Sequence, residues 1–139
     1  MNFKGKVAVV TGSAAGIGRA TAVAFAQHGA SVALLDVNQA GVEETAAMVR
    51  QAGGQALALR ADVGVEKDVA EAFQQIAASL KQIDILINNA GVELYKDFLQ
   101  FESAEWDRQL AVNLNSVYYC SKQAIPFMIR SGEGSIVNL

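Results

Sequence analysis

The chain has 139 residues, of which 52% are apolar and 18% are charged, and its formal net charge is −3. This composition is typical of a globular domain with a sizeable core and excludes a disordered chain, while the slightly acidic balance without a basic patch argues against a nucleic-acid-binding protein. No apolar run approaches the ~20 residues that a membrane-spanning helix needs, so we expect neither a nucleic acid nor a membrane as a partner.

Short β-branched apolar runs alternate with helical patterns along the whole chain. The first predicted strand covers 6–10, and a predicted helix follows over 16–28, where Gly29 can end it in the left-handed conformation. Further strands are predicted at 31–36, 55–63, within 83–91 and at 134–139. Further helices are predicted at 39–52, at 66–81, and from Ser103, the expected N-cap, towards Pro126, which we expect to end or kink the helix.

This alternation predicts an α/β fold with a doubly wound parallel sheet of the Rossmann-like type. Right-handed crossovers place helices on both faces of such a sheet, and the continuous apolar runs fit strands that are buried on both faces. We expect residues 1–139 to form one Rossmann-like domain, truncated after its fifth strand. Ligands of such sheets bind beyond the carboxyl ends of the strands, near the point where the strand order reverses.

A glycine-rich stretch, TGSAAGIG, joins the first predicted strand to the first predicted helix. Gly12 permits a tight turn, Gly16 lets a pyrophosphate approach the backbone, and Gly18 allows the helix to pack closely on the sheet. The free N–H groups of the helix N-terminus favour phosphates. No Gly-Lys-Ser/Thr follows, so an ATPase or GTPase loop is excluded.

Asp36 ends the second predicted strand, where a carboxylate can accept hydrogen bonds from the adenosine ribose of a dinucleotide. The same carboxylate repels a 2′-phosphate, at a cost of about 4 kcal/mol per unit charge at ~4 Å and an effective dielectric of ~20. The adjacent residues Ala14, Ala15, Val37 and Asn38 are neutral. The sequence therefore predicts NAD in preference to NADP.

Five stretches in this order resemble the short-chain dehydrogenase/reductase family: TGSAAGIG, the strand-end Asp36, ADV at 61–63, NNAG at 88–91 and VNLNS at 112–116. The resemblance covers the whole chain and implies a hydride transfer between a nicotinamide cofactor and a small alcohol or carbonyl substrate. It also implies a homo-oligomer, a dimer or tetramer, because the long helix often forms subunit contacts in this family.

The resemblance assigns roles to individual residues. Those implied to line the pyrophosphate and ribose are Gly12, Ser13, Gly16, Ile17 and Gly18. Those implied to lie elsewhere along the cofactor are Asp36 at the ribose, Asp62 and Val63 at the adenine, and Asn89, Ala90 and Gly91 after the fourth strand. Asn113 matches the helix asparagine that holds a proton-relay water, whereas Asn88 could equally tie two strands together.

The catalytic serine of the family follows the fifth strand, and its Tyr-x-x-x-Lys lies on the next helix, but this sequence ends with that strand at Leu139. We therefore expect the 139 residues alone to be inactive. Three interpretations stay open: the N-terminal part of an NAD-dependent oxidoreductase, a non-catalytic nucleotide-binding fragment, or a chain that continues beyond Leu139.

The stretch YYCSK contains its own Tyr-x-x-x-Lys, formed by Tyr118 and Lys122. Residues four apart share a helix face, so an ammonium beside the phenol is chemically plausible. On a uniform helix, however, Asn113 and Tyr118 point about 140° apart, and Lys122 lies roughly 28 Å from the helix start. Because strands are only ~17–20 Å long, we expect this pair low against the sheet or between helices, away from the cofactor.

We expect the remaining candidate residues to have structural rather than catalytic roles. Cys120 is the only cysteine, which suits a cytoplasmic protein, and we expect it to be a small buried apolar residue. The only histidine, His28, falls in the last turn of a predicted helix, so we predict no metal site. Phe101 and Trp106 are expected to pack at the start of the long helix, and the loop 92–102 could border a substrate pocket.

Overall fold

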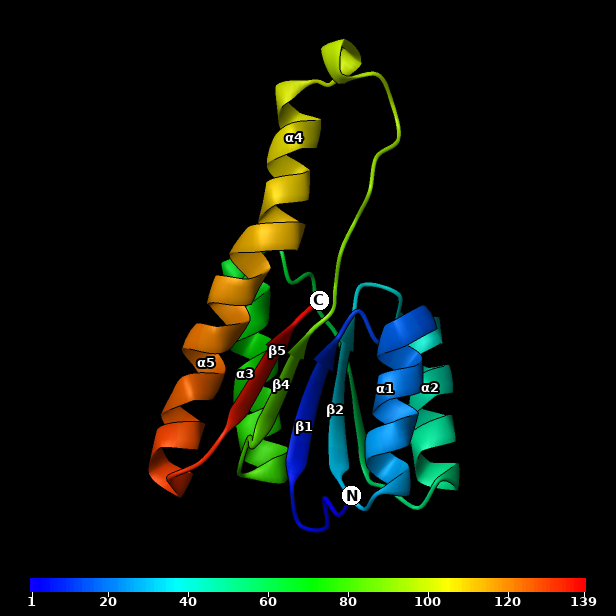
Figure 1. Cartoon of the computed structure of the whole chain (residues 1–139), viewed down its shortest axis with the longest axis vertical. Coiled ribbons are helices and arrows are strands. Elements are labelled where there is room, and N and C mark those ends of the chain that lie inside the picture. Colours follow the sequence, from blue (N-terminus) through cyan, green and yellow to red (C-terminus); the bar gives the residue numbers. More distant parts are fainter.

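The computed structural model describes residues 1–139 and contains a five-stranded parallel sheet with helices on both faces (Figure 1). The strands lie in the order β3-β2-β1-β4-β5, so the order reverses at β1 and β4. Their bounds are β1 Val7–Thr11, β2 Ser31–Asp36, β3 Ala56–Arg60, β4 Ile85–Asn88 and β5 Ser135–Asn138. The helices are α1 Gly16–Gln27, α2 Gln39–Gln51, α3 Glu66–Leu80, α4 Ser103–Leu110 and α5 Ser116–Ser131. The predicted doubly wound α/β fold is confirmed.

Alternate residues of β1 to β4 supply two separate cores, one on each face of the sheet, whereas β5 is exposed. On β1, Ala8 and Val10 belong to the core beneath α1 and α2, whereas Val9 between them belongs to the core beneath α3 and α5. All three side chains are fully buried. Both faces are apolar, which explains why the strands lack an alternating polar pattern.

The predicted long helix is divided into three segments. A π-helical segment, Ala111–Asn115, separates α4 from α5. The N-cap is Glu102, one residue before the predicted Ser103, and the Glu105 side chain accepts a hydrogen bond from its backbone N–H at 3.0 Å. The helix does not end at Pro126, because α5 continues to Ser131, while the predicted kink there stays a prediction. Ala124 and Met128 are buried in the core on either side of the proline, and this packing offsets the missing backbone hydrogen bond.

Helix α4 stands above the carboxyl edge of the sheet (Figure 1). The loop 92–102 rises from β4 to reach its start and contains one short 3₁₀ turn, Phe98–Gln100. Because α4 starts well above the sheet, the end of α4 and the π-helical segment pass the carboxyl edge of the sheet rather than its base. This places residues of α4 beside the ends of β3 and β4.

Candidate functional site

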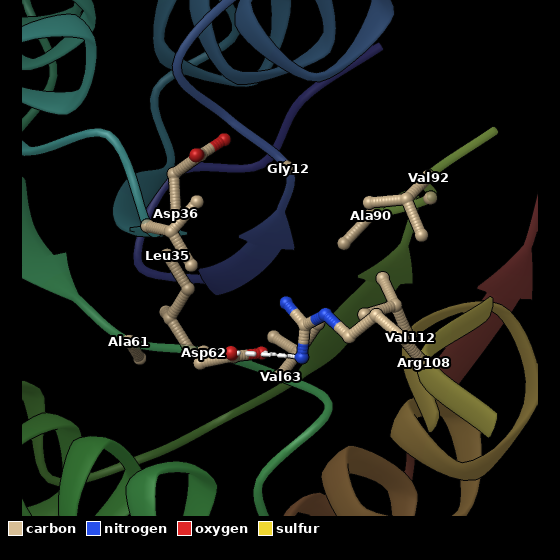
Figure 2. Close-up of a pocket in the computed structure, with 12 residues that line it drawn as sticks. Gly12, Leu35, Asp36, Ala61, Asp62, Val63, Ala90, Val92, Arg108 and Val112 are labelled. Atoms are coloured by element: carbon tan, nitrogen blue, oxygen red, sulfur yellow. Dashed lines mark hydrogen bonds and ion pairs between the residues drawn. The ribbon is translucent and has the colours of Figure 1, made fainter. Parts of the chain in front are cut away.

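A cleft of about 380 Å³, including its open mouth, lies at the carboxyl edge where the strand order reverses. Its walls come from the ends of β1, β2 and β4, the turn after β3, and the helical segments α4 and Ala111–Asn115 (Figure 2). The lining side chains are mostly apolar, and the charged ones are Asp36, Asp62 and Arg108. A slot with apolar walls and a few polar groups suits a flat organic ligand such as a purine.

The turn after β1 is packed so tightly that it requires glycine. Gly12 has a φ of +64°, and a Cβ there would lie 2.8 Å from Cα of Ala90. A Cβ on Gly18 would lie 2.2 Å from the carbonyl oxygen of Gly12, so α1 packs directly against the turn. The amide of Asn89 closes the arrangement by donating to the carbonyls of Thr11 at 2.9 Å and Gly12 at 3.1 Å.

The other residues of the glycine-rich turn point in different directions. A Cβ added at Gly16 would meet nothing within 4 Å, and the Ile17 side chain is exposed. Ser13 is buried, and its hydroxyl donates to the carbonyl of Leu35 at 3.3 Å. The contact of Ser13 with a cofactor stays a prediction. Because its hydroxyl is buried, such a contact would involve the Ser13 backbone.

Asp36 ends β2 at the rim of the cleft, as the sequence predicts. Its carboxylate accepts hydrogen bonds from the backbone N–H groups of Ala14 and Asn38, each at 3.0 Å. It therefore ties the glycine-rich turn to the end of β2. The nearby Arg19 is directed elsewhere, since its guanidinium donates to Glu44 at 2.8 Å and to Thr45 at 3.0 Å.

Asp62 and Val63 both line the cleft in the turn after β3. The Asp62 carboxylate accepts from the N–H of Gly64 at 2.9 Å and from Nη1 of Arg108, which lies 3.0 Å from Oδ1 and 2.9 Å from Oδ2. Sequence reasoning missed Arg108. No local spacing signalled it, because its partner Asp62 lies 46 residues away in the sequence.

Ala90 and Gly91 extend the cleft from the end of β4 into a second hollow, which Asn89 and Asn113 also line. The side chain of Asn113 is fully engaged by the backbone of Val92: its Oδ1 accepts at 2.8 Å and its Nδ2 donates at 2.9 Å. Asn113 lies within the π-helical segment, a feature often found at functional sites. Its predicted role in a proton relay stays a prediction.

Tyr118 and Lys122 line neither hollow. Lys122 pairs with Glu66 at the start of α3 at 3.1 Å, and this hydrogen bond raises the pKa of Lys122. Lys122 thus contacts a neighbouring helix, as one of the two predicted positions requires, and neither Tyr118 nor Lys122 lines the cleft. The expected low position is wrong, because α4 starts above the sheet, and Tyr118 is exposed rather than packed. The predicted angle of about 140° between Asn113 and Tyr118 assumed a uniform helix, and the π-helical segment that contains Asn113 breaks this assumption.

Asn88 and Cys120, two other residues considered in the sequence, have structural roles. Asn88 ties β4 to β5, because its Nδ2 donates to Oδ1 of Asn138 at 2.9 Å. Cys120 is fully buried, and burial raises the pKa of its thiol to about 12. The structure has no group of three or more His, Cys, Asp or Glu side chains arranged for a metal ion. It also has no helix long and apolar enough to cross a membrane.

The fold and the cleft together define a Rossmann-like protein with a nucleotide-sized site at its switch point. A family model described as "short chain dehydrogenase" matches residues 6–139, and the chain belongs to that family. Members of this family are dehydrogenases and reductases that bind nicotinamide cofactors and act on small-molecule substrates.

Three known proteins illustrate the similarity. The uncharacterized oxidoreductase YxbG of Bacillus subtilis is 43% identical over 98% of this chain and 50% of its own length. Cis-4-hydroxycyclohexanecarboxylate dehydrogenase of Sinomonas cyclohexanicum is 41% identical over 99% of this chain and 55% of its own length. The crystal structure of a metagenomic short-chain oxidoreductase in complex with NADP is 34% identical, with a TM-score of 0.94 over 98% of this chain and 62% of that one. The chain thus spans about half the length of the curated relatives it matches.

Proposed function

We propose that this chain is the dinucleotide-binding portion of an NAD-dependent alcohol or carbonyl oxidoreductase, in which hydride moves between NAD(H) and a small substrate. The observation that carries the proposal is the cleft at the switch point, which is lined by Gly12 of the glycine-rich turn and by the carboxylates of Asp36 and Asp62. Further along the same turn, a Cβ at Gly16 would meet nothing within 4 Å. Open backbone at a helix N-terminus suits a diphosphate, and apolar walls beyond it suit a purine.

The residues proposed to hold the cofactor fall into three groups along the cleft. Gly12, Ser13, Gly16, Ile17 and Gly18 form the turn for the diphosphate, and Asp36 meets the adenosine ribose. Asp62 and Val63 meet the adenine, while Asn89, Ala90 and Gly91 continue towards the second hollow. When bound, the cofactor supplies the hydride-accepting or hydride-donating nicotinamide ring.

The preference for NAD over NADP rests on the surroundings of Asp36. Its carboxylate lines the cleft, and Arg19 of α1 donates to Glu44 and Thr45 rather than being free for a 2′-phosphate. Like charges at ~4 Å cost about 4 kcal/mol at an effective dielectric of ~20, before salt screening. The NADP in the metagenomic oxidoreductase is a property of that protein.

The alternative function is a non-catalytic nucleotide-binding fragment. It is favoured by the position of Tyr118 and Lys122, whose side chains line neither hollow, so they are not placed to act on a bound cofactor. Asn113 is then the only residue of the family's proton-relay apparatus on these 139 residues. Both readings share the cofactor cleft and differ in turnover. The predicted cytoplasmic location stays a prediction.

Equilibrium binding tests the cofactor proposal directly. The fluorescence of Trp106, the single tryptophan, follows titrations with NADH and NADPH. We expect saturable NADH binding that is at least ~10-fold tighter than NADPH binding, a free-energy difference of about 1.4 kcal/mol. Asp36→Asn should narrow this gap, whereas Asp107→Asn, on α4, should leave it unchanged. Equal affinity of the parent chain for the two cofactors contradicts the preference, and no binding of either contradicts the function.

Turnover by the 139-residue chain tests the inactivity that both proposed functions expect of it. With NADH bound, the 139-residue chain should not oxidise it in the presence of small carbonyl compounds. Steady consumption of NADH by the purified chain would contradict both the proposed inactivity and the fragment reading.

A further inference from the structure

Arg108 is the only positively charged side chain that lines the cleft. It reaches from α4 to the turn after β3, where its Nη1 lies within 3.0 Å of both carboxylate oxygens of Asp62 (Figure 2). The ion pair therefore joins two elements that are 46 residues apart in the sequence. It lies on the side of the cleft formed by Asp62 and Val63.

The guanidinium of Arg108 packs closely on the turn after β3. A Cβ on Gly64 would lie 2.8 Å from Nη1 of Arg108 and 3.1 Å from Cγ2 of Val112, so a side chain there would press on both residues. The N–H of Gly64 also donates to Asp62 at 2.9 Å, which holds the carboxylate from the other side. The Arg108 side chain is 44% exposed, so the pair forms the rim of the cleft rather than part of the core.

Resting on the proposed cofactor, we infer that Arg108 binds the adenine of the dinucleotide: its guanidinium forms the outer wall of the base slot and holds Asp62 in place to accept from the base amino group. A planar guanidinium stacks well on an aromatic face, and the wall opposite it is apolar. Asp36 and Asp62 are the two carboxylates that line the cleft, and both repel an anionic dinucleotide. The positive charge of Arg108 offsets this repulsion.

The Arg108–Asp62 ion pair could instead hinder ligand binding, and the two roles predict opposite effects of removing Arg108. If the Arg108–Asp62 pair only closed the empty cleft, a ligand would have to break it, and removing Arg108 would strengthen binding. If Arg108 is a wall of the base slot, removing it weakens binding. The sign of the change therefore decides between the two.

The test compares NADH affinity of the whole chain with that of Arg108→Met. We expect about tenfold weaker binding, the upper range for loss of a partly desolvated cation–π contact. Arg108→Lys should recover only part of this loss, because it keeps the charge without the planar fork. The matched control is Lys122→Met, which removes the exposed Lys122–Glu66 pair at 3.1 Å and should leave NADH affinity unchanged.

A second ligand separates base recognition from a general structural effect. Deamino-NADH carries hypoxanthine, whose oxo group replaces the amino group that Asp62 is placed to accept from. The parent chain should prefer NADH to deamino-NADH, and Arg108→Met should reduce this ratio, whereas a structural loss would weaken both ligands equally. Unchanged or tighter NADH binding by Arg108→Met, or an unchanged ratio, overturns the inference. Failure of the parent chain to bind NADH at all instead overturns the proposed function on which it rests.

Discussion

A methyl group has no room at Gly18, where it would lie 2.2 Å from the carbonyl oxygen of Gly12, but it has open space at Gly16. We therefore expect Gly18→Ala to lower the free energy of unfolding by about 1–3 kcal/mol, because α1 must move away from the turn. Gly16→Ala should cost only about 1–2 kcal/mol, since its φ of +54° is strained for a residue with a Cβ.

Urea unfolding and NADH titration together separate the two glycines. Gly16→Ala should weaken NADH binding in a chain that is still folded, because the new methyl group projects into the space proposed for the diphosphate. Wild-type NADH affinity in folded Gly16→Ala would show that no ligand approaches the backbone there.

Cys120 offers a second test on the scale of one residue. Its thiol is fully buried, and burial raises its pKa to about 12, so the reactive thiolate is scarce in the folded chain. We expect a thiol reagent at mildly alkaline pH to leave folded protein unmodified and to react rapidly once urea has unfolded it. Rapid labelling without denaturant would contradict the buried position and would show that α5 opens locally.

Among the elements, the strands and the first three helices follow local patterns that the sequence displays directly. The β-branched runs, the apolar stripe of α3 and the glycines at turns act over a few residues, and their predicted bounds differ little from those observed. Asp36 could be placed at the cleft because a strand end fixes where a side chain lies, whereas Asn89 was assigned from the family resemblance. Ser13 was placed in the right turn, but its buried hydroxyl depends on the neighbouring β2 carbonyl.

The long helix shows what local patterns leave out. Within its π-helical segment, Asn113 makes two hydrogen bonds with the Val92 backbone, which join residues 21 apart. Its position high above the sheet depends on the path of the loop 92–102. Arg108 reaches the cleft only because of both, so neither its role nor its partner Asp62 could be read from spacing.

The start of α4 carries a pH-dependent contact. Glu105 accepts from Lys96 at 2.7 and 2.9 Å and from the N–H of Glu102, and these hydrogen bonds, the one from Lys96 above all, lower the pKa of Glu105. Because this pKa is lower in the folded state, the contact stabilises the fold above the ordinary carboxyl pKa. That contribution is lost as pH falls through the lowered value.

Lys96→Met should therefore lower the thermal unfolding midpoint modestly at neutral pH, by an amount that shrinks on acidification and in high salt. Lys67→Met, which removes an exposed pair with Glu71 on α3, is the matched control and should change the midpoint little at any pH. Trp106 fluorescence reports unfolding at α4 itself. A Lys96→Met effect that persists well below the carboxyl range would show that packing of the lysine stem, rather than its charge, is responsible.

For the whole molecule, the outer face of α4 and α5 presents a stripe of exposed apolar side chains. Its members recur at four- and seven-residue spacing, which is typical of residues that share one side within each helical segment. They are Trp106, Leu110, Leu114, Tyr118, Ile125 and Ile129. Exposed apolar side chains gathered on one element are a common feature of protein–protein contacts, and we propose that the protein forms its expected homo-oligomer through this face.

Charge placed on this stripe should prevent assembly without unfolding the chain. Leu114 is 62% and Ile129 is 74% exposed, so the double variant Leu114→Glu/Ile129→Glu loses little packing within the chain. We expect sedimentation velocity to give a dimer or tetramer for the parent and a monomer for this variant, because buried unpaired carboxylates are costly at an interface. Met48→Glu, on the exposed side of α2, should keep the parent's assembly state. A parent chain that sediments as a monomer at concentrations of tens of micromolar contradicts the proposal, and so does a charged variant that still assembles, since the stripe would then have to be covered in some other way.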